Sequence, residues 1–336
     1  MRAYVAQGLS TEKALEIARI SRHQYYHKPR SGNRGRPKTI ETKRKMAEED
    51  KTVVCADEVV VKEMTVVLKD PDTQYGYKRM SVALMLLGYM IGKKKVYRLM
   101  QEHVLLQKRR RVGKKKRVGQ KRVDPTRPLE LLEMDIKYVW VEEHARHAYV
   151  LTVIDTFTRF LLHKHVAYHM TRHEVIAVWE FVIVNYLQEA DALVKGLRIE
   201  VRNDNGPQFG AKDVQKFFED NNLEQLFTHP YTPQENGHIE SFHAILSEHL
   251  ERFHFQTMEE LESNIDCFYA KYNCVRLHGS IASLTPMLFW KYWDKGLITR
   301  MERERKCATF KLNIPYWQIS GNESLREFPV EARRAS

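Results

Sequence analysis

The order of apolar runs between residues 130 and 228 is the feature that most restricts how this chain can fold. Residues 130–142 and 148–155 predict two strands of a hairpin, because two strand-like apolar runs flank a short polar segment. The next residues predict a strand near 159–166 and then a helix at 171–188, in which apolar side chains recur at helical spacing. The remaining expected elements are a strand at 197–203, a helix near 211–221, a strand at 223–228 and a further helix after Pro233. The sequence therefore predicts an α/β domain with the order β-β-β-α-β-α-β-α.

Three acidic residues occupy distinct positions in these elements. Asp135 lies in the first predicted strand, Asp204 follows the fourth strand, and Glu240 lies in the last helix, with 35 residues between the second and third acids. The apolar side of that helix is expected to face the core and consists of Ile239, Phe242, Leu246, Leu250 and Phe253. The adjacent polar side consists of Glu240, His243, Ser247 and Glu251. A glutamate beside an apolar stripe is usually only solvated. The preceding Pro-Gln-Glu-Asn-Gly-His motif and the distance from Asp204 favour a functional role.

Carboxylates suit the cleavage of a phosphodiester bond. The attacking oxygen must become reactive and the leaving oxygen must be stabilised, and two divalent cations about 4 Å apart can do both. Hard cations such as Mg²⁺ prefer oxygen ligands. Three acids on separate elements can hold such cations only if the fold brings them together, which makes Asp135, Asp204 and Glu240 candidate ligands. Asp155, at the end of the second strand, is expected instead to hold backbone N–H groups or Arg159.

The charge of the chain points to a polyanion as partner. The formal net charge is +12, although many basic proteins merely carry solvated lysines. Residues 108–122 contain ten basic residues and no acidic one, which predicts a linker that lies along DNA phosphates. A nuclear localisation signal is the alternative interpretation of the same composition. The residues of this run expected to contact DNA are Arg109, Arg110, Lys114, Lys115 and Lys116.

Two segments upstream have the pattern of helical DNA-binding motifs. Residues 9–27 predict two short helices broken near Ile20, the second with a capping box at Ser21 and Gln24, although any helical hairpin would satisfy this pattern. In the second segment a helix opens at Tyr75 and ends at Gly88, and another helix starts with basic residues. The residues of this last helix expected to contact DNA are Lys93, Lys94, Lys95 and Arg98.

The cysteines, histidines and apolar runs give no sign of a zinc site, a disulfide framework or a membrane segment. The four cysteines show no Cys-x-x-Cys pairing, and His163, His165 and His169 are more typical of surface or core histidines than of metal ligands. Residues 34–37, Arg-Gly-Arg-Pro, resemble the core of an AT-hook, with an ordinary basic linker as the alternative. No apolar run reaches bilayer length and no signal peptide is apparent. We therefore expect a reduced, cytoplasmic protein that associates with the bacterial nucleoid.

Taken together, these motifs resemble a known family. The three acids in their contexts are similar to the catalytic core of retroviral integrases and of many transposases, which has the ribonuclease H-like order of elements. Tyr75-Gly76-Tyr77-Lys78-Arg79 with Tyr97-Arg98-Leu99-Met100, and Tyr272-Asn273-Cys274-Val275-Arg276-Leu277-His278 with Thr285-Pro286, resemble the second-frame product of IS-three family insertion sequences. The resemblance spans roughly residues 9–290. Further motif residues expected to contact DNA are Asn236, His243, Arg276 and His278.

The resemblance implies a DDE transposase that cleaves the 3′ ends of an insertion sequence and joins them to target DNA. It also implies that Asp135, Asp204 and Glu240 are the catalytic and metal-binding residues, with two Mg²⁺ ions as cofactor and Mn²⁺ as a substitute. The implied partners are double-stranded DNA, as terminal inverted repeats and as target, a second copy of the chain on DNA, and an upstream-frame DNA-binding protein. Three positions depart from the family pattern. Ser247 stands where such enzymes commonly carry a lysine that touches the element's end, Asn203 precedes Asp204 in place of a serine or threonine, and Pro207 replaces a small residue.

The predicted organisation is a ribonuclease H-like core with a five-stranded mixed sheet, preceded by small all-α helix-turn-helix-like segments. The expected parts are a helix-turn-helix-like segment at 1–30, a basic linker at 31–55, a second helical DNA-binding domain at 56–107, a basic linker at 108–127, the catalytic core at 128–292 and a tail without an assigned role at 293–336. A ribonuclease H-like nuclease and a catalytically silent repressor derived from a transposase remain as alternatives. Strand transfer would indicate a transposase, hydrolysis alone a nuclease, and DNA binding without chemistry a repressor.

Overall fold

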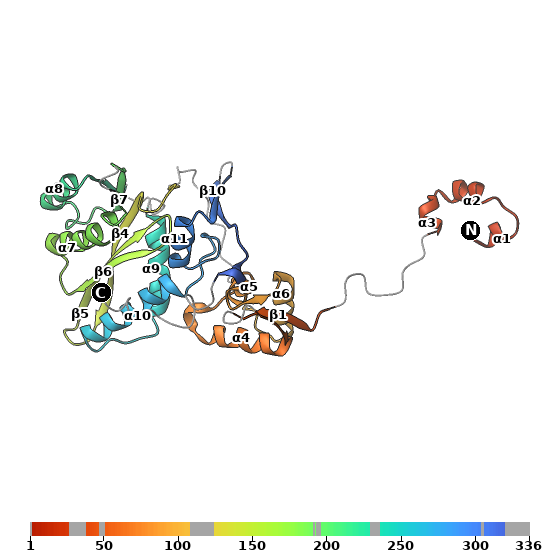
Figure 1. The fold of residues 1–336 in the computed structure, drawn as a ribbon, viewed down its shortest axis with the longest axis horizontal. Coiled ribbons are helices and arrows are strands. Elements are labelled where there is room, and N and C mark those ends of the chain that lie inside the picture. Colours follow the sequence, from red (N-terminus) through yellow and green to blue (C-terminus); the bar gives the residue numbers. More distant parts are fainter. Residues whose placement is uncertain are drawn as a thin grey trace. The chain divides into compact units, whose positions relative to one another are not determined.

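The computed structural model describes residues 2–26, 38–46, 51–107, 124–190, 192, 196–228, 236–303 and 306–319. The chain forms two compact units, which divide between Ile40 and Glu41 (Figure 1). All three predicted catalytic acids belong to the second unit. No helix in the described ranges is both long enough and apolar enough to cross a lipid bilayer.

The first unit contains three short helices. They are α1 (Arg2–Ala6), α2 (Thr11–Ala18) and α3 (Arg22–Tyr26). Ser10 caps α2 by accepting a hydrogen bond from the backbone N–H of Lys13. Ser21 and Gln24 form the predicted capping box, because each side chain accepts a hydrogen bond from the backbone N–H of the other residue. The predicted pair of helices broken near Ile20 is confirmed.

The second unit contains a five-stranded mixed sheet with the order β6-β5-β4-β7-β8. β4 pairs antiparallel with β5, and β5 with β6, whereas β7 pairs parallel with β4 and β8 with β7. The strands are β4 (Leu131–Val141), β5 (Arg146–Asp155), β6 (Leu161–Ala167), β7 (Ile199–Asn203) and β8 (Leu223–Phe227). The helices around them are α7 (Arg172–Val182), α8 (Lys212–Asp220), α9 (Gly237–Leu250) and α10 (Met258–Cys274). The predicted fold class and order of elements are confirmed.

Different helices cover the two faces of this sheet (Figure 1). Side chains alternate between the faces of a strand, so Leu132 and Met134 of β4 pack with α7 and α8, whereas Val139 and Val141 pack with α9 and α10. β4 therefore lies between two buried apolar cores. Its backbone is therefore held in place by packing on both faces of the sheet.

Two details of the predicted helices differ from the structure. Four residues of the predicted apolar stripe of α9 are buried, namely Ile239, Phe242, Leu246 and Leu250. The prediction for Phe253 is wrong, because α9 ends at Leu250 and leaves this ring 43% exposed. The helix expected at 171–188 ends as an α-helix at Val182 and continues as one π-helical turn over Ile183–Leu187.

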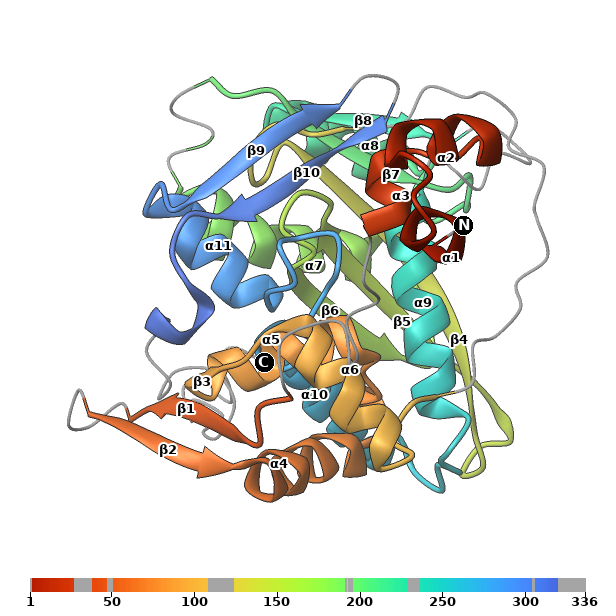
Figure 2. The same cartoon turned by 90° about the vertical axis from the view of Figure 1, so that its right-hand side faces the viewer.

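Residues 41–102 form a helical segment with a small sheet (Figure 2). Its elements are β1 (Glu41–Lys45), β2 (Thr52–Ala56), α4 (Asp57–Lys69), the 3-10 turn η1 (Pro71–Thr73), α5 (Tyr77–Leu86), β3 (Tyr89–Met90) and α6 (Lys93–Glu102). The helices predicted on either side of Gly88 are confirmed. Gly88 has a φ of 90°, and a Cβ there would collide with the carbonyl oxygen of Lys45, so this position requires glycine.

The strands β1 and β2 lie in residues 31–55, which the sequence pattern predicts to be a linker. β1 pairs with β2 and also with β3, which follows more than forty residues later, as in Lys43 opposite Met90. A basic strand such as Glu-Thr-Lys-Arg-Lys shows no apolar alternation, so its strand structure depends on this long-range pairing.

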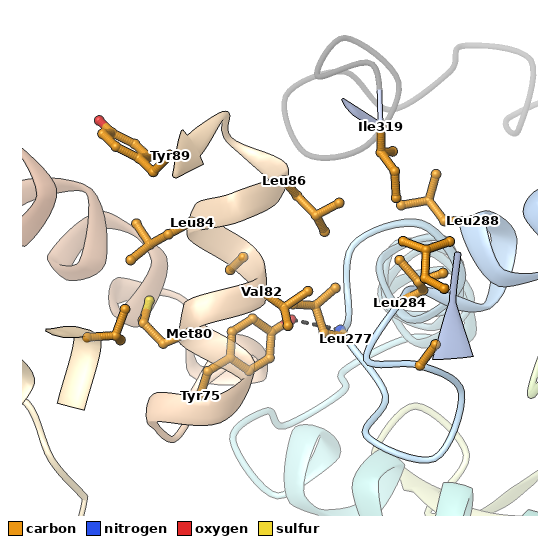
Figure 3. Packing of buried hydrophobic residues seen from close by; sticks show 14 of the residues in the cluster. Tyr75, Met80, Val82, Leu84, Leu86, Tyr89, Leu277, Leu284, Leu288 and Ile319 are labelled. Carbon is orange, nitrogen blue, oxygen red and sulfur yellow. Dashed lines mark hydrogen bonds between the residues drawn. The ribbon is translucent and has the colours of Figure 1, made fainter. Parts of the chain in front are cut away.

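The helical segment shares its hydrophobic core with the chain's C-terminal elements. These are α11 (Pro286–Asp294), β9 (Ile298–Arg303), β10 (Lys306–Leu312) and the turn η3 (Tyr316–Gln318). Figure 3 shows Val82 and Leu86 of α5 on the side that faces Leu277 and Leu284, where the Tyr75 hydroxyl accepts a hydrogen bond from the Leu277 N–H at 2.9 Å. The predicted boundaries near residues 107 and 292 therefore divide one continuous core.

The C-terminal hairpin also packs against the turn that follows β5 of the five-stranded sheet. Phe310 of β10 contacts Phe157, Phe289 and Trp293, with ring centroids 4.9–6.2 Å apart. Phe157 is almost fully buried and follows β5 directly. Residues 293–319, to which the sequence assigns no role, thus complete a core that joins the helical segment to the sheet.

Asp155 fixes the turn between β5 and β6. Its fully buried carboxylate accepts hydrogen bonds from the backbone N–H groups of Leu129, Phe157 and Thr158 at 3.0–3.3 Å, and from the Thr158 hydroxyl. Burial raises the pKa of Asp155, and these hydrogen bonds act in the opposite direction. The carboxylate has the structural role expected from its position at a strand end.

A buried charge cluster centred on Asp72 of η1 joins the helical segment to α9 and α10. The Asp72 carboxylate accepts hydrogen bonds from His249 at 3.1 Å, from Lys271 at 3.2 Å and from Arg252. His249 also contacts Asn264 Oδ1 at 2.9 Å. Burial alone would raise the pKa of Asp72, but the hydrogen bonds from His249 and Arg252 outweigh it and hold that pKa well below its usual range.

We predict that Asp72→Asn lowers the free energy of unfolding at pH 7 by about 2 kcal/mol, since it removes the buried anion that accepts hydrogen bonds from the partly exposed Arg252 and Lys271. Because the folded-state pKa is depressed, the stabilisation is present above the unfolded pKa of about 4 and is lost as pH falls below it. Urea unfolding at pH 7 and between pH 3 and 5 checks both points.

The matched control for this change is Asp213→Asn. Asp213 pairs with Arg172 at 3.0 Å, but its side chain is 58% exposed, so its neutralisation should change stability by less than about 1 kcal/mol. The stability of Asp72→Asn should also fall less steeply than that of the wild type below about pH 4. Equal stability of Asp72→Asn and the control at pH 7 would contradict a structural role for the cluster.

Candidate active site

The parallel pairing of β4 and β7 brings two of the predicted acids together. The register matches Leu131 with Glu200 and Glu133 with Arg202. Asp135 and Asp204 each follow the Glu133–Arg202 pair by two residues, so they lie at the same level of the sheet. Burial raises the pKa of Asp204, and the neighbouring charge of Asp135 raises it further. The two carboxylates therefore interact electrostatically.

The backbone around Asp204 is held by the neighbouring asparagines. Asn203 is fully buried, donates to the Asp204 carbonyl at 2.6 Å and accepts from Gln225 of β8 at 3.0 Å. Asn205 donates to the carbonyl of Thr228 at 3.0 Å. The departure from the family pattern at Asn203 thus has a structural explanation, because its amide both donates and accepts hydrogen bonds across the end of the sheet.

Glu240 lies in the first turn of α9, which packs against β4. One turn later, His243 places its Nδ1 atom 3.3 Å from Oδ2 of Asp135. The Nε2 atom of His243 is buried without a hydrogen-bond partner among the described residues. Glu240 itself is exposed. The polar face of α9 therefore meets the strand that carries Asp135, with Glu240 at its solvent-accessible end.

Glu133 is a site residue that the sequence pattern did not single out. It lies two positions before Asp135 and on the same face of β4, with a side chain that is 1% exposed. Its Oε2 atom accepts hydrogen bonds from the backbone N–H groups of His238 at 3.1 Å and Ile239 at 2.7 Å, at the start of α9. Burial raises the pKa of Glu133 to about 7, although these bonds and two nearby arginines act against it. The sequence signal that could have identified Glu133 is its i, i+2 spacing from Asp135, which places both side chains on one face of the strand.

The donor chemistry fits a hard divalent cation. Asp135 and Asp204 are two interacting carboxylates, and Glu240 lies on the helix that contacts Asp135 through His243. In the described ranges, however, no three Asp, Glu, His or Cys side chains lie close enough together to hold one ion.

The basic residues predicted to contact DNA fall into different environments. Lys93 and Lys94 are exposed in the first turn of α6. Lys95 and Arg98 instead form ion pairs with Asp57 of α4 at 2.6 and 3.0 Å. The predicted residues of the basic run, Arg109, Arg110, Lys114, Lys115 and Lys116, lie outside the described residues, as does the predicted hook at 34–37.

Three more residues predicted to contact DNA are buried or bonded within the fold. Asn236 is buried directly before α9, and Arg276 donates to the backbone carbonyl of Asp72. The His278 ring packs on Tyr272 at 4.6 Å, and burial lowers its pKa to about 3, with nearby arginine charges acting in the same direction. A DNA contact by any of these residues stays a prediction, and the contacts that the structure shows are within the fold.

Ser247 lines a groove between β4 and the last turns of α9. Its hydroxyl donates to the His243 carbonyl at 2.7 Å, as is common for a serine within a helix. The groove has a volume of about 300 Å³ and is lined by one stretch of β4 and by the end of α9, including Lys137, Trp140 and Phe253. A longer basic side chain at position 247 would reach into this groove.

Sequence comparison identifies two known kinds of domain in this chain. Two integrase core domain models match residues 125–233 and 221–286, and an HTH-like domain model matches residues 56–113. An uncharacterized 39.2 kDa protein of insertion element IS476 from Xanthomonas euvesicatoria is 28% identical over 64% of this chain and 60% of its own length. An uncharacterized 31.7 kDa protein of insertion element IS407 from Burkholderia multivorans is 25% identical over 64% of this chain and 75% of its own length.

Among solved structures, the catalytic core domain of BIV integrase is 18% identical, covering 50% of this chain and 97% of that domain with a TM-score of 0.37. The matches to the integrase core and HTH-like models adjoin one another and together extend from residue 56 to residue 286, apart from residues 114–124. The chain therefore contains an integrase core domain preceded by an HTH-like domain, and it is related to the proteins of bacterial insertion elements.

Proposed function

We propose that the protein is a DDE transposase of the IS-three family, which cleaves the 3′ ends of an insertion sequence and transfers them to target DNA with the help of divalent metal. One observation carries this proposal. Within the matched integrase core domain, Asp135 and Asp204 lie at the same level of the sheet, and α9, which carries Glu240, contacts Asp135 through His243.

In this proposal the three carboxylates hold the metal and the rest of the site positions them. Two bound Mg²⁺ ions would make the attacking oxygen more nucleophilic and stabilise the leaving oxygen. Asp135 and Asp204 supply oxygen ligands from a rigid sheet, and Glu240 supplies a third from the first turn of α9. His243 restrains the Asp135 carboxylate through its contact at 3.3 Å. The exposure of Glu240 leaves space for a DNA strand.

Binding to DNA would come mainly from other parts of the chain. Lys93 and Lys94, exposed at the start of α6 in the HTH-like domain, are placed to contact phosphates or a groove. The basic run at 108–122 adds phosphate contacts that do not depend on sequence. The proposed partners are the terminal inverted repeats, target DNA and further copies of the chain. An upstream-frame protein is a further candidate partner.

We predict that Asp204→Asn and Glu240→Gln each abolish 3′-end cleavage and strand transfer, while affinity for DNA stays within a few-fold of the wild type. Metal ligands act in the chemical step, whereas affinity comes mainly from phosphate contacts elsewhere. Cleavage and joining of a labelled terminal-repeat duplex in Mg²⁺, with binding measured by fluorescence anisotropy, check both parts.

Asp213→Asn is the control for loss of an acidic charge, because Asp213 is exposed on α8 and pairs with Arg172. It should keep full activity. Near wild-type cleavage by either active-site variant would remove the assignment of the acids. For the wild type, hydrolysis without joining would indicate a nuclease, and binding without any chemistry would indicate a repressor.

A second prediction compares two aspartates on adjoining strands. Asp135→Asn should leave thermal stability without metal equal or higher, because it relieves repulsion from Asp204, and should lose the stabilisation by Mg²⁺. Asp155→Asn should lower stability by roughly 1–3 kcal/mol, because its carboxylate holds three backbone N–H groups, and should keep the Mg²⁺ response. Melting temperatures with and without Mg²⁺ test this. The opposite pattern would show that the catalytic aspartate has been placed on the wrong strand.

A further inference from the structure

Helix α9 begins without a cap from its own sequence. The residue at its N-cap position, Asn236, makes no side-chain hydrogen bond to the first turn, and its Oδ1 atom is buried without a partner among the described residues. The first N–H groups of a helix have no acceptor within the helix and need one from elsewhere. For His238 and Ile239 that acceptor is Oε2 of Glu133, more than one hundred residues earlier in the chain.

A buried carboxylate is a costly way to fill this position. Glu133 is 1% exposed, and a neutral side chain of similar size would avoid the desolvation cost of its charge. The helix N-terminus favours a negative charge, and Arg159 and Arg202 add favourable charges nearby. The bond at 2.7 Å to Ile239 is short for an N–H donor, as expected for a charge-assisted contact.

The geometry connects this cap to the acidic residues. Glu133 and Asp135 project from the same face of β4, and each contacts α9: Glu133 at the backbone of residues 238 and 239, and Asp135 at His243. Glu240 lies between these two contacts. A shift or rotation of the first turn of α9 along β4 would therefore displace Glu240 relative to Asp135.

We propose that Glu133 is a positioning residue, which fixes the first turn of α9 on β4 so that Glu240 faces the carboxylates of Asp135 and Asp204. The inference rests on the proposed function, because it concerns the third acid of that site. Glu133 contacts neither substrate nor reacting atoms in this assignment. It acts through the helix backbone.

Three variants test the proposal. Glu133→Gln keeps a carbonyl oxygen in place of Oε2, which accepts both hydrogen bonds, whereas Glu133→Leu fills the same volume without an acceptor. Glu174→Leu is the matched control, since Glu174 also accepts a backbone N–H at a helix start, in the capping box of α7 with Thr171. It removes a helix cap that does not contact α9 or β4.

The first measurement is hydrogen exchange of the His238 and Ile239 amides without metal. Exchange should speed up at least tenfold in Glu133→Leu and stay within about threefold of the wild type in Glu133→Gln and Glu174→Leu. The second is the Mg²⁺ concentration that gives half of the thermal shift. It should rise at least tenfold in Glu133→Leu only. The rate of strand transfer at saturating DNA should fall in parallel.

The outcomes separate the two proposals. If Glu133→Leu is folded and keeps the wild-type half-saturation for Mg²⁺, Glu133 does not position Glu240. If Glu133→Leu does not fold, Glu133→Asp replaces it, because a side chain shorter by one methylene cannot reach both amides, and the same shift in Mg²⁺ is expected. If the wild type shows neither a Mg²⁺ response nor strand transfer, the proposed function fails, and the positioning role fails with it. A change in exchange alone would reduce Glu133 to a structural cap.

Discussion

The parallel pairing of β4 with β7 is the interaction on which the site depends. It is short, extending from Leu131 to Glu133 on one strand, but it sets the level at which both strands continue. Because Asp135 and Asp204 follow the same matched pair by the same number of residues, two like charges arise side by side at the end of the paired region. Their repulsion is tolerated because apolar cores on both faces of the sheet hold β4 in place.

Helix α9 depends on this strand and on the helical segment. Its first turn is bonded to Glu133, and its last turn carries His249, which is bonded to Asp72. The two contacts lie at opposite ends of a fourteen-residue helix. The helix is therefore fixed to β4 at its first turn and to the helical segment at its last turn. The C-terminal residues reinforce this connection by sharing a core with α5 and α11.

Local sequence patterns were sufficient to predict those helices, strands and turns whose structure depends mainly on their own residues. The order of strands and helices between 130 and 250, the capping box at Ser21 and the glycine that ends α5 all follow from periodicity, capping and backbone freedom. Local patterns failed for β1 and β2, because these strands need pairing with each other and with the distant β3. They also placed the end of α9 too late, and the exposed Phe253 lies three residues beyond the true end.

For the candidate site, the sequence by itself determined which acids stand at which points of the predicted elements, because motif and periodicity are properties of neighbouring residues. Only the tertiary structure decided that Asp135 and Asp204 lie at the same level of the sheet. It also decided that Lys95 and Arg98 form ion pairs within the fold and that the His278 ring is buried. It likewise decided that the C-terminal elements complete the hydrophobic core of the helical segment. It also showed Glu133 at the start of α9. These features join residues up to two hundred positions apart, and contact between such residues depends on packing and strand register, which no local pattern encodes.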